Sequence, residues 1–100
     1  MPASSNQPQI TEQLIRRFAS GESFQRGREY FRSGAVTSLT RRGERLLAEV
    51  EGSSYEPYRV DVAFDAGGIA SAQCTCPYDW GGACKHIVAT LLAYVNQRSA

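Results

Sequence analysis

Hydrophobic residues recur at helical spacing through the first third of the chain. A first helix is predicted after Thr11, which could cap it, and is expected to end at Gly21; its apolar face consists of Leu14, Ile15 and Phe18. A second helix is predicted from Glu22 or Ser23 to a stop at Gly34, with apolar positions at Phe24, Gly27, Tyr30 and Phe31. The two segments together predict a short helical hairpin.

The hydrophobic spacing changes to a period of two in the middle of the chain, which is typical of strands. Strands are predicted at residues 36–40 and 69–74, and between them the alternating positions are Leu46, Ala48, Val50, Tyr58, Val60, Val62 and Phe64. Residues 41–44, 52–54 and 65–68 are predicted to be turns. Closely spaced strands joined by short turns predict an antiparallel meander.

Helical spacing returns near the C-terminus, where one apolar stripe is formed by Ile87, Val88, Leu91, Leu92 and Val95. We interpret this stripe as core packing. Residues 1–9 are polar and contain two prolines, so they are predicted to be a disordered tail, and residues 10–97 are predicted to form one domain. The expected fold class is α+β, with an N-terminal helical hairpin, a small antiparallel β-meander and a C-terminal helix.

Composition narrows the class of protein. Hydrophobic residues make up 42% and charged residues 21% of the 100 positions, which is ordinary for a globular domain. The longest apolar run falls well short of the roughly 18 residues that span a bilayer, and the N-terminus does not show the pattern of a signal peptide. We therefore expect a cytoplasmic protein that does not bind membranes. A core of this size would gain from a metal ion that links its elements.

The strongest chemical signal is the clustering of the three cysteines with the single histidine. The spacing is Cys74-x-Cys76, then seven residues, then Cys84-x-His86. An odd number of cysteines fits an internal disulfide framework poorly, and clustered cysteines in a chain without a secretion signal indicate metal binding or catalysis. We interpret the four residues as the ligands of one structural metal ion at residues 74–86.

Local geometry lets the four side chains converge. Alternate side chains of a strand point to the same side, so the sulfurs of Cys74 and Cys76 can reach one ion before Pro77 stops the strand. Residues two apart do not face each other within a regular helix. Cys84 is therefore expected just before the final helix, with His86 in its first turn.

Three sulfurs and one nitrogen suit tetrahedral zinc, and a filled four-ligand shell is typical of a structural site. An iron–sulfur cluster is a weaker alternative because such clusters usually take four cysteines. Copper or cadmium could bind the same donors in vitro. With zinc and three thiolates the site carries a charge of −1, which the start of the helix and Lys85 could stabilise.

Catalysis is not predicted. Cys84 and His86 could in principle be a nucleophile and its base, but they are more simply two ligands of one ion. Zinc deaminases carry a glutamate two residues after a ligand histidine, and this chain has Val88 there. The sequence therefore predicts a protein that is not an enzyme and has no small-molecule substrate.

The metal-ligand segment resembles the SWIM-type zinc finger, whose pattern is Cys-x-Cys, a variable gap and Cys-x-His. Residues 74–89, CTCPYDWGGACKHIVA, match that pattern, including the apolar helix after the histidine. Upstream, residues 24–31 (FQRGREYF) and 57–60 (PYRV) look like the region before such fingers in bacterial proteins.

The resemblance implies a domain that binds DNA or proteins. Such domains occur in bacterial helicase-like ATPases of the Swi/Snf type, in plant Mutator-type transposases and in a eukaryotic signalling kinase. The chain has no phosphate-binding Gly-x-x-x-x-Gly-Lys-Ser/Thr loop, so it is not expected to be the ATPase itself. The resemblance therefore implies either a small accessory partner of a helicase-like machine or the N-terminal domain of a larger protein.

Two functions follow as hypotheses. The first is nucleic-acid binding, for which the candidate residues are Arg26, Arg28, Arg32, Arg41, Arg42, Arg45, Lys85, Tyr78 and Trp80. Arginine suits phosphate contacts, although a solvated face or a compositional bias would also account for these arginines. The aromatic pair could equally pack over the zinc site.

The second hypothesis is a protein-interaction module. Three bound thiolates and one zinc ion would move the net charge from +1 to about 0, which gives nucleic acid no overall attraction. Tyr78 and Trp80 would then be anchors at an interface. Salt separates the two hypotheses, because binding to phosphate weakens steeply as salt rises.

Overall fold

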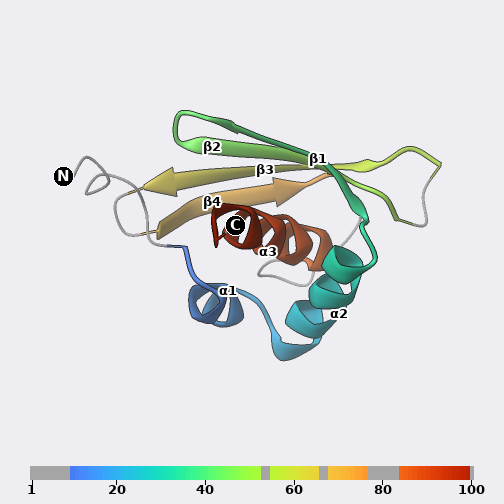
Figure 1. Cartoon of the computed structure of the whole chain (residues 1–100), viewed down its shortest axis with the longest axis horizontal. Coiled ribbons are helices and arrows are strands. Elements are labelled where there is room, and N and C mark those ends of the chain that lie inside the picture. The colour runs from blue at the N-terminus through green and yellow to red at the C-terminus, as the bar shows by residue number, and fades with distance from the viewer. Residues whose placement is uncertain (1–9, 53–54, 66–67, 77–83, 100) are drawn as a thin grey trace.

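In the part of the chain that the structure describes, four antiparallel strands form one sheet in chain order, and three helices lie on one side of it (Figure 1). The computed structural model describes residues 10–52, 55–65, 68–76 and 84–99. Its elements are α1 (Glu12–Phe18), α2 (Gly21–Arg32), β1 (Val36–Arg42), β2 (Arg45–Val50), β3 (Tyr58–Asp65), β4 (Gly68–Cys74) and α3 (Lys85–Ser99). The predicted α+β class and the antiparallel meander are confirmed. The predicted tail at residues 1–9 lies outside the described residues.

The inner face of the sheet is apolar because every second residue of its two central strands points toward the helices. Its buried side chains are Leu46, Ala48, Val50, Val60, Val62 and Phe64. The register pairs Leu46 with Val62 and Ala48 with Val60, so large and small residues from neighbouring strands meet on one face. The period of two seen in the sequence is therefore the period of this core.

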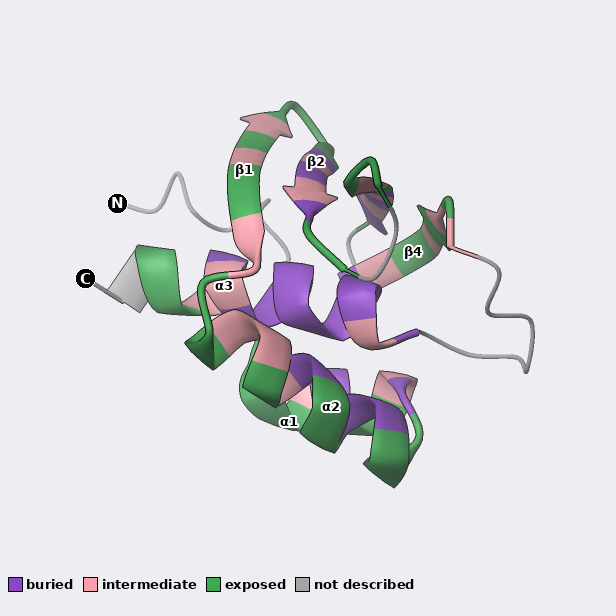
Figure 2. Ribbon diagram, turned by 90° about the vertical axis from the view of Figure 1, so that its right-hand side faces the viewer, coloured by how far each residue is buried: buried purple, intermediate pink, exposed green. Residues whose placement is uncertain are grey.

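Helix α3 lies between the sheet and the two N-terminal helices, and it packs against α1, α2 and all four strands. Every residue from His86 to Leu92 is buried, which Figure 2 shows as a continuous buried segment. The sequence predicted a single apolar stripe, but a helix covered on two sides buries residues all round. Its one hydroxyl in this stretch, on Thr90, donates to the carbonyl of His86 at 2.9 Å.

The boundary between the first two helices differs from the prediction. Gly21 was expected to end the first helix, but α1 ends at Phe18 and Gly21 is the first residue of α2. Ser20 accounts for the difference, because its side-chain oxygen accepts a hydrogen bond from the Ser23 amide at 3.1 Å and so caps a new helix. The predicted cap at Thr11 and the stop after α2 at Gly34 are confirmed, the latter with φ of +80°.

The first hairpin turn is also shorter than predicted. Residues 41–44 were expected to form it, but β1 continues to Arg42 and β2 starts at Arg45, which leaves two residues in the turn. Arg41 belongs to β1, and its side chain is fixed by two contacts. Its guanidinium carbon lies 4.9 Å from the Phe64 ring centroid, and it donates a hydrogen bond to the Tyr94 hydroxyl. The side chain of Arg41 therefore covers one end of the core.

No helix within the described residues is long and apolar enough to cross a bilayer.

Candidate metal centre and basic surface

The end of β4 and the start of α3 supply the four predicted metal ligands. Cys74 is the last residue of β4, Cys84 directly precedes α3, and His86 lies in the first turn of that helix. Pairing with β3 continues past Cys74, because the Thr75 amide donates to the Arg59 carbonyl at 3.1 Å. The extended backbone places Cys76 on the same side as Cys74. The predicted positions of Cys84 and His86 relative to the helix are confirmed.

The four side chains form one cluster, with one donor atom from each residue lying within 4.8 Å of the others. His86 Nδ1 lies 3.8 Å from the Sγ of Cys74 and 3.8 Å from the Sγ of Cys84. Ordinary zinc bond lengths in a tetrahedron place nitrogen and sulfur about 3.6 Å apart and two sulfurs about 3.8 Å apart. The donor set and its spacing therefore fit a single zinc ion with all four positions filled by protein.

Electrostatics favour a thiolate at the start of α3. The pKa of Cys84 is lowered to about 4, chiefly because the Cys74 thiol donates to its sulfur, with burial opposing and His86 and the Ile87 amide assisting. The pKa of Cys74 is raised, mainly because it is the donor in that pair and partly by burial. Cys84 is thus the first of the pair to ionise, and bound zinc would deprotonate all three cysteines.

The outer nitrogen of His86 is enclosed by aromatic and glycine neighbours. Its Nε2 is buried and has no hydrogen-bond partner in the described part of the chain. The imidazole centroid lies 4.4 Å from that of Tyr58 and 5.3 Å from that of Tyr30. A Cβ at Gly52 would come within 3.3 Å of Nε2, so a glycine there lets the backbone approach the ring. The sequence did not predict this surrounding, which orients His86.

We expect zinc to bind His86 through Nδ1, with the proton on Nε2. The nitrogen that faces the sulfurs is Nδ1, and neutral imidazole keeps its proton on the other nitrogen. Long-range ¹H–¹⁵N spectra of the zinc-loaded chain should show a protonated Nε2 and a zinc-shifted Nδ1. A spectrum with the proton on Nδ1 would mean that the ring is turned over relative to this structure.

The chain is similar to known proteins in the region that contains this site. Residues 58–95 match the family model of the SWIM zinc finger. Zinc finger SWIM domain-containing protein 8 of Homo sapiens, and that of Bos taurus, are 37% identical over 87 residues, which cover 81% of this chain. The chain spans only 5–6% of the length of these curated relatives. No solved structure matches it.

The match, the motif and the geometry together define the class of domain. The residues of the Cys-x-Cys-x7-Cys-x-His motif lie inside the matched region and form one cluster. The chain carries a SWIM zinc finger, and its cofactor is one zinc ion.

The predicted nucleic-acid-binding residues do not form one surface. Arg41 covers the core, and Arg45 forms an ion pair with Asp61 on the outer face of the sheet, with Arg45 Nε 3.2 Å from Asp61 Oδ1. Arg26, Arg28 and Arg32 lie on α2, on the opposite side of the molecule from that outer face. Lys85 lies at the start of α3, with Nζ 5.1 Å from the Tyr30 centroid. Tyr78 and Trp80 lie outside the described residues.

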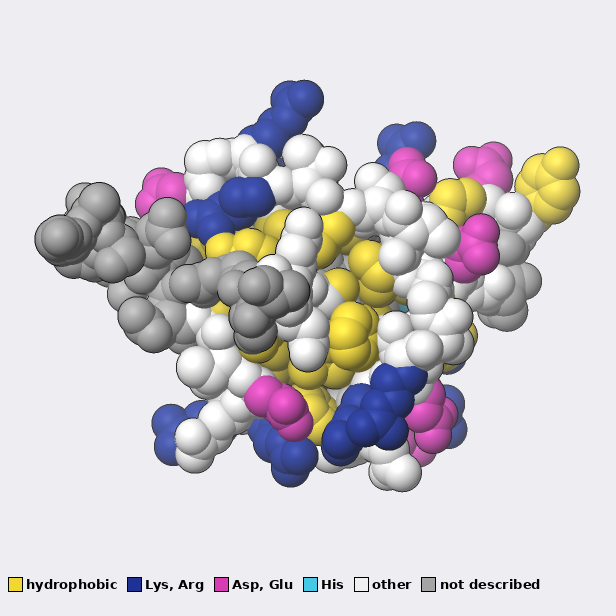
Figure 3. Space-filling model, in the orientation of Figure 1, with side chains coloured by type: hydrophobic (Ala, Val, Ile, Leu, Met, Phe, Trp, Pro, Cys, Tyr) yellow, Lys and Arg dark blue, Asp and Glu magenta, His cyan; other side chains and the backbone are white. Residues whose placement is uncertain are grey.

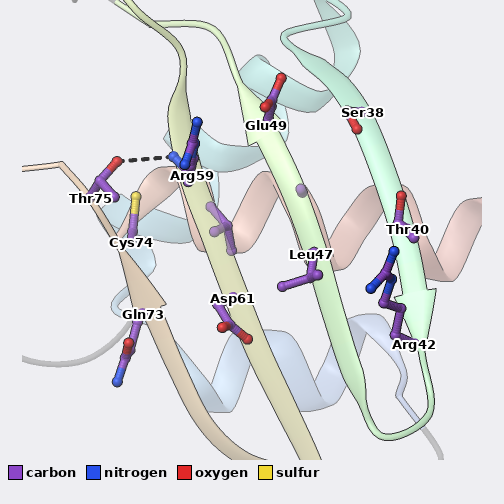
Figure 4. Close-up of a pocket in the computed structure, with 12 residues that line it drawn as sticks. Ser38, Thr40, Arg42, Leu47, Glu49, Arg59, Asp61, Gln73, Cys74 and Thr75 are labelled. Carbon is purple, nitrogen blue, oxygen red and sulfur yellow. Dashed lines mark hydrogen bonds between the residues drawn. The ribbon is translucent and has the colours of Figure 1, made fainter.

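The outer face of the sheet has mixed charge. It forms an open hollow of about 490 Å³, and Figure 4 shows Arg42 and Arg59 standing on the same face as Glu49 and Asp61. No aromatic side chain is among the described residues that line it. Strand pairing thus places Arg42 and Arg45 among acidic groups, and their contact with nucleic acid stays a prediction.

Positive charge gathers instead on the N-terminal helices. Residues 10–35 contain five arginines and three glutamates, whereas residues 36–76 contain four arginines and six acidic residues. Figure 3 shows Lys and Arg side chains along the lower margin of the view, where α1 and α2 lie. Arg16 and Arg17 of α1 were not among the predicted residues, although the excess of arginine before residue 36 could have indicated them.

Proposed function

We propose that this chain is a zinc-stabilised module that binds nucleic acid through its helical face, formed by α1 and α2. The observation that carries the proposal is the distribution of charge, with an arginine excess in residues 10–35, which include both N-terminal helices, and an acidic excess in residues 36–76, which comprise the strands and the loops that join them. Nucleic-acid affinity comes largely from phosphate neutralisation, for which arginine is well suited. The helical face would therefore approach the backbone with the sheet turned away.

The arginines of this face are available to phosphate. Arg16 and Arg26 pair with Glu12 at 3.4 Å and Glu22 at 3.3 Å, but all four side chains are at least half exposed. Exposed pairs of this kind contribute roughly 0 to 1 kcal/mol, so a phosphate can replace the carboxylate. Arg32 is exposed and has no acidic partner within 4 Å in the described part of the chain.

Zinc would support this function indirectly. Its four ligands fill a tetrahedral shell, so the ion would offer no open position to a substrate. The ion would hold the end of β4 to the start of α3, against which α2 packs. We infer a binding role rather than a catalytic one, as an accessory element of a larger protein or of a helicase-like partner, as the family resemblance implies.

Matched pairs of arginine substitutions test the proposal. We expect the zinc-loaded chain to bind labelled duplex DNA at low salt and to lose much of that affinity at physiological salt. Arg26→Ala with Arg32→Ala should weaken binding roughly tenfold at low salt and flatten the salt dependence. Arg42→Ala with Arg59→Ala removes the same charge from the sheet and should have little effect. Fluorescence anisotropy would measure DNA binding by the wild-type chain and by the two double variants.

The opposite ranking of the two pairs would place the binding surface on the sheet and contradict the proposal. Absence of DNA binding even at low salt would favour the protein-interaction module instead.

A further inference from the structure

A shallow hollow of about 380 Å³ opens between α1 and α2. Arg16 lines it from α1, and four residues of α2 line the other side: Gly21, Phe24, Gln25 and Arg28. These four recur at i, i+3, i+4 and i+7, so they share one face of the helix. The hollow therefore brings together guanidinium groups from two separate helices, and no acidic residue is among the described residues that line it.

Arg16 is held at this hollow by an aromatic ring. Its guanidinium carbon lies 4.6 Å from the centroid of Phe24, whose side chain belongs to the core and is only 7% exposed. Stacking fixes the plane of a guanidinium while leaving the N–H groups along its edge free to donate. Because the ring of Phe24 is buried and covered by Arg16, it does not offer a free face to a nucleobase.

Arg28 completes the hollow as an uncompensated charge. Its side chain is partly buried, and no acidic side chain lies within 4 Å of it in the described part of the chain. Gly21, the first residue of α2, leaves the space beside its Cα open, because an added Cβ would meet nothing within 4 Å. The hollow is thus open to solvent and lined by two arginines: Arg28, which has no such partner, and Arg16, which is stacked on Phe24 and shares its charge with the exposed Glu12 at 3.4 Å.

We propose that this hollow binds a phosphate group, with Arg16 and Arg28 donating to its oxygens. Two guanidinium groups around one opening match the several acceptor oxygens of a phosphate. That the phosphate belongs to a nucleic-acid backbone rests on the proposed function. The affinity of the hollow for phosphate itself does not.

The first test is an NMR titration of the zinc-loaded chain with inorganic phosphate, followed through the arginine Nε–Hε signals. The signals of Arg16 and Arg28 should shift in a saturable way, whereas that of Arg42 on the sheet should not. Gly21→Glu should abolish both shifts, because it places a carboxylate beside the hollow. Its Cβ has room, and acidic residues are favourable in a first helical turn, so the fold should be kept.

The second test uses duplex DNA and anisotropy. Arg28→Ala should reduce the slope of log affinity against log salt by about 1, the value expected for one lost phosphate contact. Gly21→Glu should weaken binding further. If the wild-type chain binds DNA and neither variant changes that binding, the hollow is not the phosphate site, and the proposed function is unaffected. If phosphate shifts the Arg16 and Arg28 signals but the chain does not bind DNA, the hollow is an anion site whose phosphate does not come from DNA. Phosphate that shifts neither signal would overturn the proposal itself.

Discussion

Removal of zinc is expected to unfold most of this domain rather than the metal-binding segment alone. Zinc contributes roughly 10 to 16 kcal/mol in small structural sites, and whole domains are stable by about 5 to 15 kcal/mol. The ligands connect β4 to α3, and α3 lies between the sheet and both N-terminal helices. Residues 88–91, in the middle of this helix, are fully buried. Releasing the start of α3 therefore loosens both layers of the core.

Chelation and a ligand variant should give the same result. Cys84→Ser is expected to lower the free energy of unfolding by about 4 kcal/mol or more, since loss of a metal site is among the most destabilising changes known. Ser71→Ala, an exposed change in β4, serves as the control and should shift the melting temperature little. Circular dichroism and amide NMR would follow both, and re-added zinc should restore only the chelated wild type. A chelated chain that kept its dispersed spectrum would contradict this account.

The second large effect is expected at Gly27, where α2 meets α3. A Cβ at this position would lie 2.5 Å from the Cβ of Val88 and 2.8 Å from the carbonyl oxygen of Lys85. The second contact is with backbone, so a rotamer change cannot relieve it. Gly27→Ala should therefore force α2 away from the zinc-bearing helix and cost about 1 to 3 kcal/mol, as overpacked cores do.

Gly21→Ala is the matched control for this effect. Gly21 lies in the same helix, but an added Cβ there would meet no described atom within 4 Å. Alanine restricts the unfolded chain more than glycine, so this variant should be unchanged or more stable by up to about 1 kcal/mol. Chemical denaturation of both variants measures the difference. Equal stabilities would show that the two helices do not approach as closely as described.

The local parts of this structure could be predicted from the sequence. The alternation of Val60, Val62 and Phe64 identified the inner face of a strand, because side-chain direction in a strand depends only on position. The four ligands were likewise identifiable from their types and spacing, since a metal imposes that spacing directly. Helix caps were predicted where the capping residue was recognised, as at Thr11, and missed at Ser20.

The parts that depend on long-range packing could not be predicted. A stripe on α3 gives no sign that a second layer covers the opposite side of the helix. Arg41 reads as a turn residue in the sequence, but its contacts with Phe64 and Tyr94 exist only after distant segments meet. Arg41 and Arg42 were predicted to lie in one turn, and sequence proximity does not show that they point to opposite faces of a strand.

Native mass spectrometry of the folded chain, purified without added metal, measures how much zinc the site holds. We predict one zinc ion per chain in the wild type, and loss of that ion in Cys84→Ser and in His86→Ala. The four side chains converge on one cluster, which would hold a single ion. A folded wild-type chain that carries no zinc, or a His86→Ala chain that retains it with native stability, would show that the cluster is not a structural zinc site.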